Sequence, residues 1–186
     1  GSRTLLVDCD LRKPTVHKKL HISSDKGLSN VLVGFAEFDE AVSHINPNFD
    51  VFTAGPTPPN PSELLASEAF DKFMEEAKSK YDYIIIDTPP VNVVADALVI
   101  APRTSGVIIV IRDHVTYHED FKTTKSKIEF ANIKLLGTVF NGVDLKADGK
   151  YKYKSKYHKK YGYGYGYGYG YGYGYGYGYG NEKGAD

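Results

Sequence analysis

The chain has 186 residues, with 23 basic and 23 acidic side chains, so that its formal net charge is zero. This balance conceals a division, because residues 1–144 carry 15 Lys or Arg and 20 Asp or Glu, whereas residues 145–186 carry 8 and 3. A single cysteine, Cys9, excludes a disulfide framework and favours a reducing compartment. No apolar run approaches the roughly 20 residues that a membrane-spanning helix needs. We therefore expect a cytoplasmic protein with one domain of ordinary size and an additional segment.

Five short runs rich in β-branched residues divide the first part of the chain. They are nearly continuous rather than alternating in hydropathy, which is typical of strands that are covered on both faces. Segments with helix-start signals separate most of them, and strands that alternate with helices predict a parallel α/β sheet. The predicted strands are residues 4–9, 50–53, 83–87, 107–111 and 135–140.

Three helix starts follow from capping patterns. Asn60 precedes a proline at the first helical position and a glutamate at the third. Ser67 can cap a second helix, whose apolar residues recur at the i, i+3, i+4, i+7 spacing of one helix face. Thr116 and Glu119 form a capping box for a third helix that runs to about Ala131. The apolar face of the second helix consists of Phe70, Phe73, Met74 and Ala77.

Three carboxylates stand at the ends of predicted strands. Asp8 and Asp10 end the first strand and Asp87 ends the third. Because ligands of such sheets bind at the carboxyl ends of the strands, we expect these groups to lie close together. Together they could bind a magnesium ion and still leave one carboxylate as a general base.

Two alternatives remain open for these residues. An aspartate at a strand end also forms turns for purely local reasons. Asp8-Cys9-Asp10 moreover matches the Asp-x-Asp metal motif of sugar-nucleotide glycosyltransferases, although that interpretation leaves Asp87 and the end of the chain unexplained.

The carboxyl-terminal segment has a different composition. Residues 145–160 contain seven lysines and three tyrosines, and residues 161–180 are ten consecutive Tyr-Gly dipeptides. Glycine at every second position makes ordering costly in entropy, and there is no aliphatic core to offset that cost. We therefore predict that residues 146–186 are a disordered tail. A low-complexity aromatic spacer that binds aromatic groups or nucleic acid is the alternative interpretation.

Taken together, the motifs resemble those of the bacterial tyrosine kinases of capsular and exopolysaccharide biosynthesis. Residues 5–14 (LLVDCDLRKP) resemble their Walker A′ motif, and residues 83–90 (YIIIDTPP) resemble their Walker B motif. Residues 55–65 (GPTPPNPSELL) resemble the segment between the two, and the tyrosine-rich end resembles their autophosphorylated cluster. The resemblance implies a parallel-sheet, P-loop NTPase-like domain of the deviant Walker type.

The resemblance also implies the roles of the three carboxylates and of ATP and Mg²⁺ as cofactors. Asp8 is expected to take the proton of the acceptor tyrosine, with Asp10 and Asp87 as ligands of the Mg²⁺ ion. The division of labour among the three stays open.

Three further residues are expected to contact the cofactor. Arg12 belongs to the Walker A′ match and would orient Asp8 or Asp10, although exposed pairing is its simpler interpretation. Thr88 would face the γ-phosphate. Asn141 resembles an adenine-reading asparagine of related ATPases, but an asparagine after a strand also forms ordinary turns.

The function implied is an ATP-dependent protein-tyrosine autokinase that regulates polysaccharide synthesis by phosphorylating its tail in trans. Its implied partners are a membrane-embedded polysaccharide co-polymerase that activates it, a phosphotyrosine phosphatase and further copies in a ring. No nucleic acid is implied, and the activator would hold the kinase at the inner face of the membrane. The predicted acceptors are Tyr161, Tyr163, Tyr165, Tyr167, Tyr169, Tyr171, Tyr173, Tyr175, Tyr177 and Tyr179.

The sequence departs from the family pattern in one respect. The Walker A motif G-x-x-x-x-G-K-[ST], whose backbone amides hold the phosphates, does not occur in it. We therefore expect residues 1–145 to be a partial nucleotide-binding domain without the P-loop, its strand and its helix. Such a domain would bind ATP weakly or not at all and would expose apolar surface.

Two other functions stay open. A deviant-Walker ATPase of the partition type would share the carboxylates, but it should end in an amphipathic membrane helix or a DNA-binding surface. A non-catalytic scaffold would keep the sheet and use the Tyr-Gly tail for adhesion.

Overall fold

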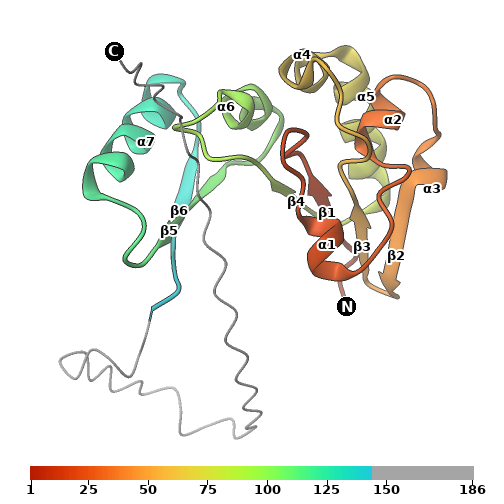
Figure 1. Ribbon diagram of the computed structural model, residues 1–186, viewed down its shortest axis with the longest axis horizontal. Helices are drawn as coiled ribbons and strands as arrows, with labels where there is room; N and C mark the ends of the chain where they lie inside the picture. Colours follow the sequence, from red (N-terminus) through yellow and green to blue (C-terminus); the bar gives the residue numbers. More distant parts are fainter. Residues whose placement is uncertain (144–186) are drawn as a thin grey trace, which may run out of the picture. The chain divides into compact units, whose positions relative to one another are not determined.

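The computed structural model describes residues 1–143, and its first sheet is built around β1 (Thr4–Asp8) (Figure 1). This strand lies inside a four-stranded sheet of order β2-β3-β1-β4. Its neighbours β3 (Phe49–Phe52) and β4 (Tyr83–Asp87) both run parallel to it. β2 (Val42–Asn46) pairs antiparallel with β3 and forms one edge, with a register irregularity between His44 and Asn46.

The second sheet contains two strands. β5 (Val107–Arg112) and β6 (Leu135–Asn141) pair in parallel, and α7 (His118–Phe130) connects them (Figure 1). α6 (Asp96–Ile100) and the 3₁₀ turn η1 (Ala101–Arg103) link β4 to β5. The other helices are α1 (Val16–Leu20), α2 (Leu28–Leu32), α3 (Phe38–Ala41), α4 (Pro61–Ala66) and α5 (Glu68–Lys80).

The core is an aromatic cluster between the first sheet and α5. Phe52 on β3 packs edge-on against Phe73 of α5, with ring centroids 4.9 Å apart, and against Phe38 of α3 at 4.7 Å. Ser67 caps α5, since its hydroxyl accepts the amide of Phe70. The four residues predicted to face inward from this helix are all buried. The sequence prediction for α5 is therefore confirmed.

The strands β4 and β5 each have an exposed face. Ile85 of β4 is 56% exposed, and Ile108 and Val110 of β5 are 57% and 60% exposed. Among the described residues, no strand pairs with the second edge of β4 or with the outer edge of β5. The prediction of strands covered on both faces therefore holds for β1 and β3, where Leu5, Val51 and their neighbours are buried, and is wrong for β4, β5 and β6.

Three other details differ from the predictions. The antiparallel strand β2 was not predicted, because its sequence VSHIN is short and mostly polar. The predicted sheet is divided in two in the described part of the chain. α7 begins at His118 rather than after a Thr116 cap, because the Thr116 hydroxyl accepts the amide of Arg112 and leaves Tyr117 at the cap position.

A buried carboxyl group lies near the amino ends of the strands. Asp50 of β3 accepts the hydroxyl of Tyr81 at 2.7 Å and lies 2.7 Å from the Nδ1 atom of His44. Arg3 forms a longer ion pair with it at 3.8 Å. Asp50 thereby ties β3 to the neighbouring strand β2, to the end of α5 and to the segment that enters β1.

Candidate active site at the carboxyl edge of the first sheet

Parallel pairing of β1 with β4 brings the predicted carboxylates together. Asp8 and Asp87 are the last residues of their strands and stand opposite each other in register. The amide of Cys9 donates to the carbonyl of Asp87 at 2.8 Å and extends the ladder past both residues. The prediction that Asp8 and Asp87 lie close together is therefore confirmed: they are neighbours at the carboxyl ends of β1 and β4.

Asp8 is fully buried and held by the turn that follows it. Its two carboxyl oxygens accept the amides of Asp10 and Val16, each at 3.1 Å. Burial raises the pKa of the Asp8 carboxyl above its ordinary value, and the negative charge of Asp87 adds to this effect, while the two amides oppose it. Asp8 is thus an oriented group that binds a proton more readily than a free aspartate.

Asp10 and Asp87 are the carboxylates that remain open to a ligand. One oxygen of Asp10 accepts the amides of Arg12 and Lys13 at 3.2 and 2.9 Å, which leaves the other oxygen without a hydrogen bond from the described residues. Asp87 is exposed, and no described group donates a hydrogen bond to its carboxyl. Partial removal from water raises the pKa of Asp87, with Lys19 opposing the shift and Asp10 adding to it.

The donor set suits a magnesium ion that is bound together with phosphate. Within residues 1–143, no group of three or more His, Cys, Asp or Glu side chains is arranged to hold a metal ion. Mg²⁺ bound to a nucleotide usually takes only one or two carboxylates, with water and phosphate oxygens as its other ligands. The open oxygens of Asp10 and Asp87 fit that requirement.

Arg12 contacts other protein groups with its side chain. Its Nε donates to Asp96 at 2.9 Å, and its Nη2 donates to the Ser62 hydroxyl at 2.8 Å and to Asp96 at 3.3 Å. The Ser62 hydroxyl in turn donates to Asp96 at 2.6 Å. The predicted contact between Arg12 and the cofactor stays a prediction, since the guanidinium is already engaged in a network of three residues.

The other two predicted cofactor residues lie in different places. Thr88 directly follows Asp87 and is half-buried. Asn141 is the last residue of β6, opposite Arg112, and its side chain makes no hydrogen bond within residues 1–143. No described contact joins Asn141 to the carboxylates. Its role as an adenine-reading residue stays a prediction, as does that of Thr88.

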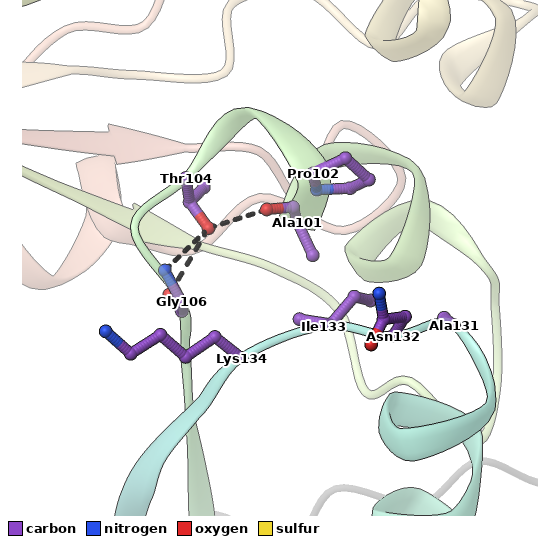
Figure 2. Close-up of a pocket in the computed structure, with 8 residues that line it drawn as sticks. All are labelled: Ala101, Pro102, Thr104, Gly106, Ala131, Asn132, Ile133 and Lys134. Atoms are coloured by element: carbon purple, nitrogen blue, oxygen red, sulfur yellow. Dashed lines mark hydrogen bonds between the residues drawn. The ribbon is translucent and has the colours of Figure 1, made fainter.

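A hollow elsewhere in the molecule lacks the groups for phosphoryl transfer. Figure 2 shows it at the loops that enter β5 and β6, where the Thr104 hydroxyl donates to the carbonyl of Ala101 and also contacts Gly106. Lys134 is its one charged lining residue. Because the hollow lies at the amino ends of these strands, it is separate from the carboxylate site.

Known proteins similar to this chain carry tyrosine-protein kinase names. CapB of Staphylococcus aureus is 38% identical over 154 residues, which are 82% of this chain and 68% of CapB. YwqD of Bacillus subtilis is 39% identical over 154 residues, which are 82% of this chain and 65% of YwqD. The chain belongs to the bacterial tyrosine-protein kinases. Kinases of this family are phosphotransferases.

Solved structures agree with this assignment. The kinase domain of the Escherichia coli tyrosine kinase ETK superposes with a TM-score of 0.73 and 31% identity, covering 90% of this chain and 61% of that domain. The septum site-determining protein MinD of Pyrococcus horikoshii, complexed with Mg-ADP, has a TM-score of 0.59 and 22% identity over 75% of this chain and 58% of its own, and so shares the fold alone. The P-loop NTPase-like fold class is thus confirmed. No family model matches the sequence.

Several predictions lie outside the described residues. The tail 146–186 and its acceptors Tyr161 to Tyr179 belong to the part of the chain that the structure does not describe, so the boundary at residue 145 stays a prediction. Within residues 1–143, no helix is both long enough and apolar enough to cross a membrane.

Sequence reasoning missed two residues next to the site. Asp96 and Ser62 form the network with Arg12, but they lie 84 and 50 positions from it in the chain. An aspartate in the first turn of a helix is ordinarily explained by the helix dipole. No spacing rule links residues so far apart.

Proposed function

We propose that this chain is the catalytic part of an ATP-dependent protein-tyrosine autokinase that regulates capsule or exopolysaccharide synthesis. One observation supports the proposal most directly: Asp8 and Asp87 end adjacent parallel strands in register, with Asp10 beside them. Oriented carboxylates at this edge are what phosphoryl transfer from a metal-bound nucleotide requires. Membership of the tyrosine kinase family makes tyrosine the proposed acceptor.

The three carboxylates divide the chemistry according to their surroundings. Asp10 and Asp87 would hold Mg²⁺, which when bound neutralises charge on the triphosphate. Asp8 takes the proton of the acceptor hydroxyl, and its raised pKa suits a group that must accept a proton. Thr88, beside Asp87, contacts the terminal phosphate, and Asn141 contacts the base. Arg12 orients the turn that carries Asp10.

Binding of the ATP phosphates requires a further structural element. No Gly-x₄-Gly-Lys-Ser/Thr motif occurs in the 186 residues, and within residues 1–143 β4 and β5 each have an unpaired edge beside exposed apolar side chains. We infer that a strand and helix with this motif pair with these edges in the active kinase. The 186-residue chain alone should therefore bind Mg-ATP more weakly than about 1 mM, as measured by calorimetry.

The acceptor and partner assignments belong to the same proposal. Tyr161 to Tyr179 are the tyrosines to be phosphorylated in trans by another copy in a ring. A phosphotyrosine phosphatase would reverse the reaction. A membrane-embedded co-polymerase protein would activate the kinase and hold it at the inner face of the membrane. Each phosphate adds about −1.5 to −2 charges, so four or five would reverse the positive charge of residues 145–186.

The test measures phosphotyrosine in the chain joined to the Walker A strand and helix of a family member, with Mg-ATP. Asp8→Asn, Asp10→Asn and Asp87→Asn should each reduce the rate by about 10²-fold or more. Asp25→Asn is the matched control, because Asp25 is exposed and bonds only to nearby Ser23. It should keep the wild-type rate.

Two results would contradict the proposal. One is phosphotyrosine formation that persists when the three carboxylates are removed together. The other is ATP hydrolysis by the wild type without any phosphotyrosine, which would favour the partition-type ATPase instead. A third result concerns only the proposal that copies in a ring phosphorylate one another's tails. It would be contradicted if replacing all ten tail tyrosines with phenylalanine left the oligomer size unchanged.

A further inference from the structure

A network of three side chains adjoins the turn after β1 and connects segments from three parts of the sequence. Arg12 follows β1, Ser62 lies in the first turn of α4, and Asp96 opens α6. Asp96 is fully buried, and its carboxylate accepts three hydrogen bonds from the other two residues. We propose that Asp96 is a positioning residue which, through Arg12, holds the Asp8–Asp10 turn in place relative to Asp87. This proposal rests on the proposed kinase function of that edge.

Arg12 links the network to the site through its own backbone. Its amide donates to the Asp10 carboxyl at 3.2 Å, while its guanidinium is fixed on Asp96 at the other end of the side chain. A planar guanidinium that binds a carboxylate with two nitrogens restricts both position and orientation. Fixing the Arg12 side chain therefore fixes the amide that orients Asp10.

The other end of the network lies on the segment that leaves β4. Asp96 is nine positions after Asp87, and the loop between them is held by α7 at two points. The side-chain amide of Asn92 donates to the carbonyl of Asp120 at 2.9 Å, and the Lys127 ammonium group donates to the carbonyl of Val91 at 3.2 Å. Asp96 thus belongs to a segment that is anchored on both sides.

The electrostatics agree with this arrangement. Burial opposes ionisation of Asp96, but the hydrogen bonds from Arg12 and Ser62 outweigh it and lower the pKa of the Asp96 carboxyl. The network therefore contains a buried carboxylate that stays ionised because of the arginine beside Asp10. Replacing Asp96 by asparagine keeps the shape and removes the charge that orients Arg12.

A second arginine–aspartate pair provides a matched control. Arg103 at the end of η1 bonds to Asp71 of α5 and to the carbonyl groups of Val99 and Ala66. It joins the α6–η1 segment to the α4–α5 segment, which the first network also connects, through Asp96 and Ser62. Within the described residues it makes no hydrogen bond to the turn after β1, so Asp71→Asn removes an arginine–aspartate bridge away from the site, at an aspartate that is 47% exposed where Asp96 is buried.

The first measurement is amide hydrogen exchange in the full 186-residue chain, which needs no catalytic activity. Asp96→Asn should accelerate exchange of the amides that donate to the carboxyl groups of Asp8 and Asp10 by about tenfold. Exchange of core amides such as that of Phe52 should stay within about twofold of the wild-type rate. Asp71→Asn should leave the same amides unchanged. Arg12→Lys, which keeps the charge but lacks the planar fork, should give an intermediate acceleration. The reporting amides are those of Asp10, Arg12, Lys13 and Val16.

The second measurement is steady-state tyrosine phosphorylation by the chain joined to a Walker A segment. Asp96→Asn should lower kcat about tenfold or more and leave the KM for ATP within about twofold, because misplacement of catalytic groups affects the reaction rather than binding. Asp71→Asn should change neither value.

Either of two results overturns the proposal. One is acceleration of exchange by Asp96→Asn that is equal throughout the fold, which would indicate a merely structural role. The other is an equal effect of Asp71→Asn on the four reporting amides. A wild-type protein without kinase activity would refute the proposed function instead, and hydrogen exchange would still decide the role of Asp96.

Discussion

The first sheet carries carboxyl groups near both ends of its strands, and two of them, Asp50 and Asp87, have opposite surroundings. Near the amino ends of the strands, Asp50 is buried and contacts Tyr81, His44 and Arg3. At the carboxyl ends, Asp87 has no hydrogen-bond donor within residues 1–143, and its pKa is raised. A buried carboxyl group with several partners, such as Asp50, stabilises the fold, whereas the Asp87 carboxyl keeps its bonding capacity for a ligand in the proposed function. The contrast therefore distinguishes a structural carboxyl group from one that is proposed to be functional.

The largest expected effect on stability is at Asp50. Asp50→Ala removes the acceptor for the Tyr81 hydroxyl and should lower the free energy of unfolding by about 3 kcal/mol, because a buried polar group loses its partner. Urea denaturation of the full chain at pH 7 measures this value. A loss below about 0.5 kcal/mol would show that Asp50 is not the structural group in this comparison.

A smaller effect is expected when only one contact is removed. Tyr81→Phe deletes a single hydroxyl and leaves His44 and Arg3 beside Asp50, so the loss should be about 1.5 kcal/mol. The same denaturation experiment applies, with Tyr117→Phe as the control because Tyr117 is 78% exposed. Equal losses in the two variants would remove the basis for distinguishing partnered from unpartnered groups.

The smallest effect is expected at Asp87. Its folded-state pKa lies above the ordinary 3.8, so the ionised group costs stability at neutral pH, and this cost disappears as the pH falls through the folded-state pKa towards 3.8. Because solvent screens the charge of this exposed residue, Asp87→Asn should raise stability at pH 7 by only a small amount, up to about 0.5 kcal/mol, and the gain should vanish below about pH 4. Thermal melting between pH 3 and pH 8 tests the sign. A variant that is less stable at pH 7 would make Asp87 a structural group as well.

Local patterns were sufficient to predict much of the fold and the centre of the site. The runs around β1 and β4 and the Ser67 cap of α5 could be predicted from neighbouring residues alone. The meeting of Asp8 with Asp87 followed from the rule that parallel strands end at one edge.

Interactions between distant residues could not be predicted in this way. Asp50 finds Tyr81 at a separation of 31 residues, and Arg12 finds Asp96 at 84. Such pairs depend on how helices pack over the sheet, and the local hydrophobic periodicity of the sequence does not predict that packing. The exposed faces of β4 and β5 escaped prediction for a related reason, since an apolar run has the same sequence pattern whether one face or two are covered.

The antiparallel strand β2 affects the side on which a further strand can pair with the first sheet. Its irregular register between His44 and Asn46, followed by Pro47, interrupts the regular row of amides and carbonyls that another strand would need. The opposite side of this sheet, at β4, has no such obstacle. A polypeptide that extends this sheet would therefore pair with β4, the strand that carries Asp87, so that in the proposed kinase one pairing event would complete both the sheet and the proposed catalytic centre.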